Sequence, residues 1–327
     1  MHQFGFRLSV LISVALLGGC ASSRHSQDEK YFLIATNIKL PYWQTARAGL
    51  ARAASVLNVK TEMVGPDTYN PGAQHEEFQR VLKLKPAGIL VSVGDAKLIQ
   101  PDIDQAMSAG IPVITMDSDA EGSNRLLFIG TDNYKAGMQG GELVARELHG
   151  SGNVVIYTMP SQANLYQRLH GYQDVFAGHP KIKVLQIIDI KGDSGVAFDA
   201  TKAILANGSG KVDAFVCLEA VACPEVADVL EREHVLHKLV VAMDTEPRTI
   251  DWIQKGGIFA TIGQKPFTMA YYGVRMLDDM HHDGKLGSLN NRSPFSPIPA
   301  FVDTGATLID KGNVRNFVEQ LNSETKN

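Results

Sequence analysis

Residues 89–96 of the chain read ILVSVGDA and residues 113–119 read VITMDSD, while in the second half residues 214–220 read AFVCLEA and residues 240–246 read VVAMDTE. In both pairs, an apolar run typical of a buried strand is followed by a second apolar run that ends in Met-Asp. The separation within each pair is nearly the same. We interpret the match as an internal duplication, which predicts two similar lobes.

The same alternation of patterns extends over most of the chain. Apolar runs alternate with stretches of helical spacing, and strands that alternate with helices of about 10–15 residues indicate βαβ units and a parallel sheet. The predicted fold class is therefore α/β, with two similar doubly wound parallel-sheet lobes. The predicted strands cover residues 31–36, 59–64, 88–93, 112–117, 153–158, 183–189, 213–218 and 238–244.

Asp117 and Asp244 end the repeated apolar runs of the two halves. In open α/β sheets, ligands bind outside the carboxyl ends of the strands. If the two lobes face each other, these carboxylates lie on opposite walls of one cleft. Each carboxylate can accept hydrogen bonds from two hydroxyls, at roughly 1.5–3 kcal/mol each. The alternative role for each Asp is to cap the helix that follows.

The chain begins with the pattern of an export signal. One Arg precedes the apolar run LSVLISVALLGG (8–19), which is too short to cross about 30 Å of hydrocarbon. The following Cys20 completes LGGC (17–20), which resembles a bacterial lipobox. We predict a lipoprotein signal peptide over residues 1–19 and a lipidated tether over 20–30, on the periplasmic or cell-surface face of a bacterial membrane. The alternative is an ordinary export signal with an incidental Cys20.

Composition excludes several other classes of protein. The chain has 327 residues, 44% of them hydrophobic and 20% charged, with a net charge of −4. This length suggests about two globular units, and the absence of a basic stripe argues against a nucleic-acid partner. Neither G-x-S-x-G nor H-E-x-x-H occurs, and GSGK (208–211) matches only the tail of a phosphate loop. We therefore predict that the protein is not an enzyme and has no catalytic residue, cofactor or metal ion. The adjacent histidines His281 and His282 are not expected to bind a metal either.

Six short motifs narrow the assignment further. In chain order they are LPYW (40–43), GIPVITMD (110–117), GTDN (130–133), RLHGY (168–172), VVAMD (240–244) and ATIGQKP (260–266). In this order they resemble a periplasmic sugar-binding protein of ABC importers, of the ribose-binding type, and the resemblance covers about residues 31–310.

The resemblance implies the type I periplasmic binding protein fold, whose chain crosses three times between its lobes. Here the crossings fall near residues 131–133, 264 and 297–302. Lobe 1 is then expected over 31–131 plus 265–298, and lobe 2 over 132–264 plus 299–321. Such proteins close by hinge motion around a ligand. The implied ligand is a small sugar or polyol, the implied partner is an importer permease in the membrane, and the chain is expected to be a monomer.

The resemblance and the chemistry of sugars together select binding residues. A sugar presents weakly apolar faces to aromatic rings and hydroxyls to converging polar groups. At least one of Tyr42 and Trp43 is predicted to stack on the ligand, the alternative being a core cluster at the start of a helix. Gln264, at a crossing, is predicted to bind the ligand, the alternative being a hydrogen bond within the hinge.

Four further binding candidates belong to lobe 2. The family often places an Arg where this chain has Tyr166, two residues before Arg168, whose alternative role is a supporting salt bridge. Asn164 precedes both in the same segment. Glu219 is the polar group left at a strand end where ribose binders have Asn and Asp, because Leu218 replaces the Asn.

Leu218 is one of three departures from the ribose binders, since Leu40 replaces an Asn and Ser118 replaces an Arg. Sites built from hydrogen-bonding groups reject ligands that leave those groups unpaired, so such changes redirect specificity. We therefore expect a small sugar or polyol other than ribose. The alternatives are a nucleoside or a signalling furanone as ligand, or a periplasmic sensor that reports to a membrane receptor. A repressor of the same core is excluded by the export signal.

Cys217 and Cys223 lie close in the sequence, and the predicted export signal would place them on the oxidising side of the membrane. A disulfide is plausible in such a compartment. Two buried thiols remain the alternative.

Overall fold

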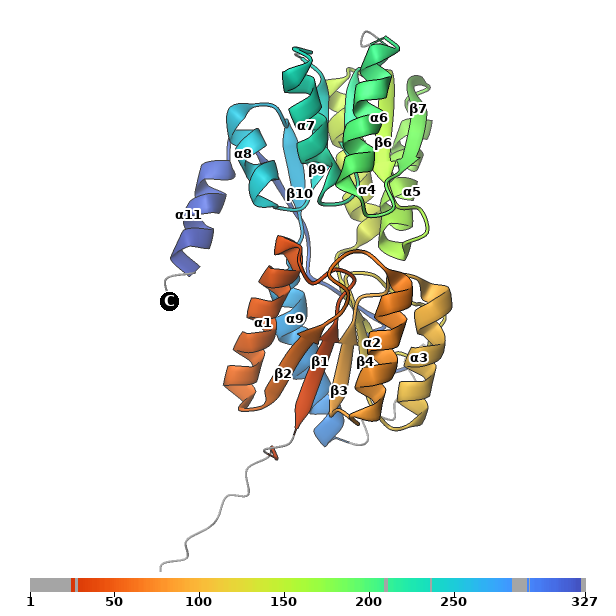
Figure 1. Cartoon of the computed structure of the whole chain (residues 1–327), viewed down its shortest axis with the longest axis vertical. Coiled ribbons are helices and arrows are strands. Elements are labelled where there is room, and N and C mark those ends of the chain that lie inside the picture. The colour runs from red at the N-terminus through yellow and green to blue at the C-terminus, as the bar shows by residue number, and fades with distance from the viewer. Residues whose placement is uncertain are drawn as a thin grey trace, which may run out of the picture.

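The computed structural model describes residues 25–26, 29–208, 211–235, 237–283, 293 and 295–324 (Figure 1). The predicted signal peptide and lipidation site, residues 1–20, lie outside this part of the chain, as does most of the predicted tether. Within the described residues, no helix is long and apolar enough to cross a membrane.

The first lobe is built on a six-stranded sheet with the order β11-β5-β4-β3-β1-β2, in which all paired strands are parallel. Its helices are α1, α2, α3 and α9. The strands are β1 (Lys30–Ile34), β2 (Lys60–Val64), β3 (Gly88–Val91), β4 (Val113–Met116), β5 (Phe128–Gly130) and β11 (Phe301–Asp303), and the helices are α1 (Pro41–Leu57), α2 (Pro71–Lys83), α3 (Ala96–Ser108) and α9 (Pro266–His282).

The second lobe has a six-stranded sheet with the order β12-β10-β9-β8-β6-β7, parallel except for the β10–β12 pair. Its strands are β6 (Ser151–Thr158), β7 (Lys181–Asp189), β8 (Ala214–Cys217), β9 (Leu239–Met243), β10 (Ala260–Gly263) and β12 (Thr307–Asp310). Its helices are α4 (Asn133–Glu147), α5 (Ala163–Ala177), α6 (Ser194–Ala206), α7 (Ala222–Arg232), α8 (Pro247–Lys255) and α11 (Val314–Glu324).

The two strand orders are the same once each strand is matched to its counterpart in the other lobe. This confirms the predicted α/β fold with two similar doubly wound lobes. Each sheet is covered on both faces; Figure 1 shows α6 and α7 on one side of the second sheet and α4 and α5 on the other. In lobe 1, Leu33 packs with α1 and α9, whereas its neighbour Ile34 packs with α2 and α3. Burial on both faces explains why the strands read as continuous apolar runs.

Local sequence determines where several helices begin. Pro41, Pro247 and Pro266 are the first residues of α1, α8 and α9, and the fixed φ of proline suits this position. Asp132 caps α4, because its side chain accepts a hydrogen bond from the backbone N–H of Lys135. Only Thr131 separates Asp132 from the end of β5, so this cap lies where the chain first leaves lobe 1.

The chain crosses between the lobes three times. The first crossing lies between Gly130 of β5 and Asn133 of α4, and the second between Gly263 of β10 and Pro266 of α9. The third lies between β11, in the first sheet, and β12, in the second. The third crossing was predicted near residues 297–302, and this segment of lobe 2 was predicted to start at residue 299. Both predictions are wrong, because residues up to 303 belong to the first sheet.

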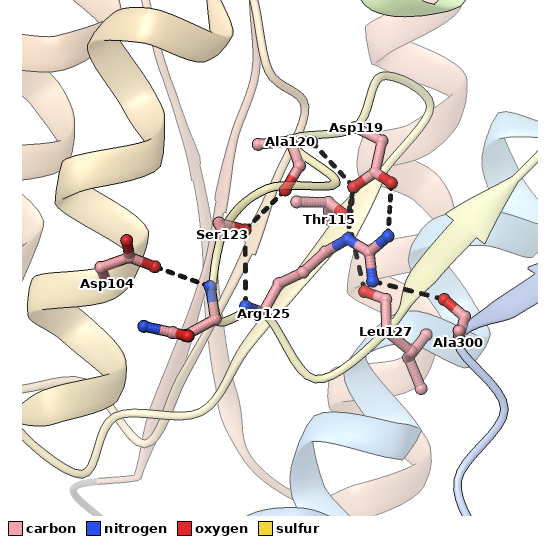
Figure 2. Close-up of polar contacts among 9 residues, drawn as sticks. Asp104, Thr115, Asp119, Ala120, Ser123, Arg125, Leu127 and Ala300 are labelled. Carbon is pink, nitrogen blue, oxygen red and sulfur yellow. Dashed lines mark hydrogen bonds and ion pairs between the residues drawn. The ribbon is translucent and has the colours of Figure 1, made fainter. Parts of the chain in front are cut away.

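Two contacts explain why the third crossing comes later than expected. Phe301 to Asp303 pair with β5 as an edge strand of the first sheet. The guanidinium of Arg125, which forms a partly buried ion pair with Asp119, also donates a hydrogen bond to the carbonyl oxygen of Ala300 at 3.3 Å (Figure 2). The loop between β4 and β5 thus holds this segment on lobe 1.

Candidate ligand-binding site

A cavity of about 220 Å³ lies between the lobes, where the carboxyl ends of the strands of both sheets meet. This volume is below the range of about 300–1,000 Å³ that is typical of sites for drug-sized ligands, so the cavity suits a small solute. Both lobes contribute to the lining. From lobe 1 it includes Thr36, Asn37, Leu40, Tyr42, Trp43, Tyr69 and Asp117; from lobe 2 it includes Met159, Gln162, Asn164, Leu165, Arg168, Gly192, Ser194, Glu219, Ala220, Val221 and Asp244; Gln264 lies at the second crossing.

Asp117 follows β4 and reaches the cavity from lobe 1. Its backbone φ is 64°, in the left-handed region that Asp tolerates better than most residues. One carboxylate oxygen accepts from the hydroxyl of Tyr42 at 2.8 Å and the other from the hydroxyl of Ser92 at 2.9 Å. These two donors orient the carboxylate and leave it lone pairs for a ligand.

Asp244 follows β9 and is the counterpart of Asp117 in lobe 2. Its φ is 67°, and one carboxylate oxygen accepts from the side-chain amide of Gln264 at 2.9 Å. The amide oxygen of Gln264 is buried and has no hydrogen-bond partner among the described residues. Because a buried acceptor without a partner is costly, this oxygen is suited to accept from a ligand hydroxyl.

Arg168 supplies a guanidinium to the same cavity from α5. Its side chain is 2% exposed and donates to the side-chain oxygen of Asn133 at 2.8 Å and to the carbonyl of Leu218 at 2.7 Å. Its remaining terminal nitrogen, Nη2, is buried and lacks a hydrogen-bond partner within the described chain. Arg168 is therefore both held in place and left with donor capacity.

Tyr42 and Trp43 lie in the first turn of α1, with ring centroids 5.1 Å apart in an edge-to-face arrangement. Both line the cavity, but they are buried to different extents. Trp43 is 2% exposed and packs in the core of lobe 1, which agrees with the alternative role of a core residue at the start of a helix. Tyr42 is less buried, and its hydroxyl contacts Asp117. Tyr42 is thus the better placed of the two for a ligand.

Glu219 and Asn164 line the lobe 2 side of the cavity, and both also have local structural contacts. The carboxylate of Glu219 accepts from the backbone N–H groups of Val221 at 2.7 Å and Ala222 at 2.9 Å, at the start of α7. The side-chain oxygen of Asn164 accepts from the backbone N–H of Leu165 at 2.9 Å.

Tyr166 is the one predicted binding residue that the structure places elsewhere, so that prediction is wrong. Its side chain is 54% exposed and lies beside His170, outside the cavity lining. Residues two positions apart on a helix are rotated by about 200° around its axis, so the side chains of Tyr166 and Arg168 cannot point in the same direction. Arg168 faces the cavity, and Tyr166 faces solvent.

Buried carboxylates dominate the electrostatics of the site. Burial raises the pKa of Asp244 to about 6, although Arg168 lowers it, and burial raises the pKa of Glu219 to about 7. Burial also raises the pKa of Asp117. Burial raises the pKa of Glu246 to about 7, with a further contribution from the charge of Asp244. The cavity is rich in hydrogen-bond acceptors, which favours a ligand that offers several donors.

Glu246, which follows β9 at the start of α8, was not among the predicted site residues. It is 9% exposed, and one carboxylate oxygen accepts from the backbone N–H of Tyr42 at 3.1 Å. This hydrogen bond joins lobe 2 to lobe 1 beside the cavity. The internal duplication is the signal in the sequence that could have indicated this residue, because Glu246 aligns with Asp119 of the first half. Asp119 instead pairs with Arg125 inside lobe 1 (Figure 2).

Cys217, the last residue of β8, and Cys223, in the first turn of α7, are joined by a disulfide. Of the two alternatives left open by the sequence, the structure thus has the bridge. It ties the strand to the helix whose start Glu219 caps, and so it braces the lobe 2 wall of the cavity.

Two similar lobes, three crossings and a polar cavity at facing strand ends define a solute-binding protein of two lobes. The chain belongs to the family of the periplasmic binding protein domain, whose model matches residues 31–285. This confirms the family predicted from the motifs.

Known proteins of this kind match along most of their length. The D-allose-binding periplasmic protein of Escherichia coli K12 is 21% identical over 304 residues, which cover 89% of this chain and 97% of the relative. The arabinose-binding protein AraP of Geobacillus stearothermophilus has a similar structure, with a TM-score of 0.75, 31% identity and coverage of 89% and 99%. An ABC transporter solute-binding protein of Burkholderia graminis in complex with D-arabinose has a TM-score of 0.80, 26% identity and coverage of 88% and 97%. Because these relatives are binding proteins, the chain belongs to a class of binding proteins and not of enzymes.

Proposed function

We propose that this protein captures a small sugar or polyol in the cleft between its lobes and delivers it to an ABC importer. The observation that carries the proposal is the set of buried groups that converge on the cavity with hydrogen-bonding capacity to spare. Asp117 and Asp244 face it from opposite lobes, Gln264 offers a free acceptor, and Arg168 offers a free donor.

The chemistry of these groups matches a polyhydroxylated ligand. Carboxylates only accept hydrogen bonds, so Asp117 and Asp244 need donors, and each sugar hydroxyl donates one bond while it accepts others. The unpartnered nitrogen of Arg168 suits a ring or hydroxyl oxygen. Tyr42 offers an aromatic surface for the C–H face of a sugar. The volume of about 220 Å³ favours a monosaccharide over a larger solute.

Positions that differ from the ribose binders support a sugar other than ribose. Leu40 lines the cavity and presents an apolar side chain where those proteins have an Asn. Ser118 and Leu218 are fully buried, and Leu218 reaches the site through its carbonyl oxygen, which accepts from Arg168. The similar proteins named above bind arabinose or allose, so pentoses and hexoses other than ribose are the first ligands to test.

Anchoring and delivery form the second part of the proposal. Lipidation at Cys20 would hold the protein at a membrane, on the face where a permease can receive ligand from the closed lobes. Ligand stabilises closure by its greater affinity for the closed form. The hydrogen bond between Tyr42 and Glu246 joins the two lobes and would help to hold the closed form.

The test is thermal unfolding of the protein with a panel of pentoses, hexoses, deoxysugars, polyols and nucleosides. A ligand at about 100 times its dissociation constant adds about 2.7 kcal/mol. In lobes of this size, that raises the unfolding midpoint by roughly 5–10 °C. We expect one sugar or polyol to produce this shift in the wild type and not in Asp244→Asn. If only nucleosides raise the unfolding midpoint, or if no sugar or polyol in the panel raises it, the ligand assignment is overturned.

A further inference from the structure

Four side chains form a compact cluster at the end of lobe 1 that is remote from the cleft. His25, Glu29, Asp278 and His282 each contribute one nitrogen or oxygen atom, and these four atoms lie within 4.8 Å of one another. His25 and Glu29 precede β1, while Asp278 and His282 lie one turn apart near the end of α9. Figure 1 shows that β1 begins and α9 ends at the same end of the lobe.

We propose that this cluster binds one divalent transition-metal ion, with zinc as the best match. Zinc in proteins prefers four ligands drawn from imidazole nitrogens, thiolates and carboxylate oxygens. Two imidazoles and two carboxylates provide such a set, and the two carboxylates balance the charge of the ion. Calcium and magnesium prefer oxygen ligands alone, so the imidazoles select against them.

The orientation of His282 supports a cation at this position. Its Nδ1 lies 2.8 Å from the carbonyl oxygen of Asp278, which can only accept, so Nδ1 carries a proton. In the neutral ring, Nε2 then has a lone pair, and it lies 3.3 Å from a carboxylate oxygen of Glu29. Two acceptors in contact need a positive centre between them. Histidines that bind metals usually donate their other N–H to a backbone carbonyl in this way.

The carboxylates of the cluster point to the same conclusion. Oε2 of Glu29 is buried and has no hydrogen-bond partner among the described residues. The side chain of Asp278 is 1% exposed, accepts from the hydroxyl of Tyr31 at 3.0 Å and contacts Nε2 of His25 at 3.0 Å. Buried carboxylates are costly unless a cation or several donors compensate them. A bound metal ion would compensate both.

The spacing of the cluster is close to that of a filled site. Bonds of about 2.0–2.2 Å to a tetrahedral zinc ion place neighbouring ligand atoms roughly 3.3–3.6 Å apart. The contacts of His25 with Asp278 and of His282 with Glu29, at 3.0 and 3.3 Å, need only small side-chain adjustments. The side chains of His25 and His282 are 15% and 17% exposed, which leaves the ion a path from solvent.

Such a site would fasten the segment that precedes β1 to α9. His25 and Asp278 are 253 positions apart in the sequence, so the ion would join the start of lobe 1 to its last helix. The alternative is a network without a metal ion, in which protonated histidines form hydrogen bonds and ion pairs with the two carboxylates. The two cases differ in whether zinc binds and stabilises the protein.

The test is zinc binding by the full chain, purified in detergent with a tag that lacks histidine. Competition against a chromophoric chelator measures the dissociation constant, elemental analysis gives the stoichiometry, and thermal unfolding is recorded with and without zinc. We expect one zinc per chain, a dissociation constant below about 1 μM, and a higher unfolding midpoint with zinc. His25→Ala and His282→Ala should each weaken binding at least tenfold.

His281→Ala is the matched control, because it removes an exposed imidazole beside the cluster on the same helix. It should bind zinc as the wild type does. If His282→Ala fails to fold, His25→Ala carries the test, since His25 lies outside the sheets and helices. Absence of saturable zinc binding in the wild type, or equal affinity in His25→Ala, would overturn the proposal. Sugar binding should be the same with and without zinc, so this test is independent of the proposed function.

Discussion

Asp117 and Asp244 occupy the same place in the two lobes: each follows the fourth strand of its half, and their φ angles, 64° and 67°, differ by only a few degrees. Their partners differ. Asp117 accepts from two hydroxyls within its own lobe, whereas Asp244 accepts from the side-chain amide and the backbone N–H of Gln264, at the second crossing. Each carboxylate is thus held by two donors and has lone pairs left for a ligand.

Asp244→Asn should weaken sugar binding at least about 100-fold, because a carboxylate that accepts two ligand hydroxyls contributes roughly 1.5–3 kcal/mol per bond. Asn suits the left-handed backbone here, whereas Ala would add about 1–2 kcal/mol of strain. Titration calorimetry with the ligand found by thermal unfolding measures the effect. Asp251→Ala, which changes an exposed Asp of the same lobe, is the control. Equal affinities of Asp244→Asn and the wild type would remove Asp244 from the site.

Glu219 should make the stability of the ligand-free protein depend on pH. Burial raises its pKa from the ordinary value of 4.5 to about 7, so the folded state favours the protonated form. The resulting stability is fully present below about pH 4.5 and is lost as the pH rises to about 7, a change of roughly 3 kcal/mol at most. Denaturant unfolding at pH 5 and pH 8 measures it.

Glu219→Gln should reduce that difference between pH 5 and pH 8, because glutamine does not titrate. Glu231→Gln, an exposed position on α7, should keep the wild-type difference. The comparison uses the pH difference within each variant, since glutamine also alters the hydrogen bonds to Val221 and Ala222. An unchanged pH difference in Glu219→Gln would contradict the assignment.

Reduction of the Cys217–Cys223 disulfide should lower the free energy of unfolding by about 2 kcal/mol, because the bridge closes a short loop in the unfolded chain. Denaturant unfolding with and without reductant measures this. The double variant Cys217→Ala/Cys223→Ala should be as stable as the reduced wild type and insensitive to reductant. Two free thiols found by titration of the denatured, unreduced protein would show that the bridge does not form.

Cys20→Ser should release the protein from the membrane, because serine cannot carry the thioether-linked lipid. Cell fractionation and intact mass measure the effect: the wild type should be found with membranes and carry the added mass of the lipid. Ser22→Ala, in the same segment, should behave as the wild type. A membrane-bound Cys20→Ser variant would mean that something other than this Cys holds the protein there.

The repeated pattern around residues 89–119 and 214–246 was sufficient to predict the α/β class, the two lobes and most of the strands. Apolar periodicity is a local property that reflects burial of each element, so it can be read without knowledge of the partners. Short strands such as β5 and β10, of three and four residues, were not among the predicted strands, because so few residues hardly show a period.

The candidate site was predicted less completely, for reasons that particular residues illustrate. Glu246 and Asp119 share a repeat position, yet Glu246 accepts from Tyr42 of the other lobe and Asp119 pairs with Arg125 inside its own. Tyr166 and Arg168 share a helix, and the packing of α5 on its sheet determines which of them faces the cavity. Such choices depend on neighbours that are distant in the sequence.

The amino-acid sequence alone therefore settled the class of fold, the family, and the aspartates at the ends of the repeated strands, because these follow from burial patterns and motifs within short segments. The contacts between distant segments had to come from the folded chain. They include the later third crossing, the Tyr42–Glu246 hydrogen bond, and the cluster of His25 with Asp278. The physical reason is that hydrogen bonds and ion pairs act over a few ångströms, and only folding brings these groups that close.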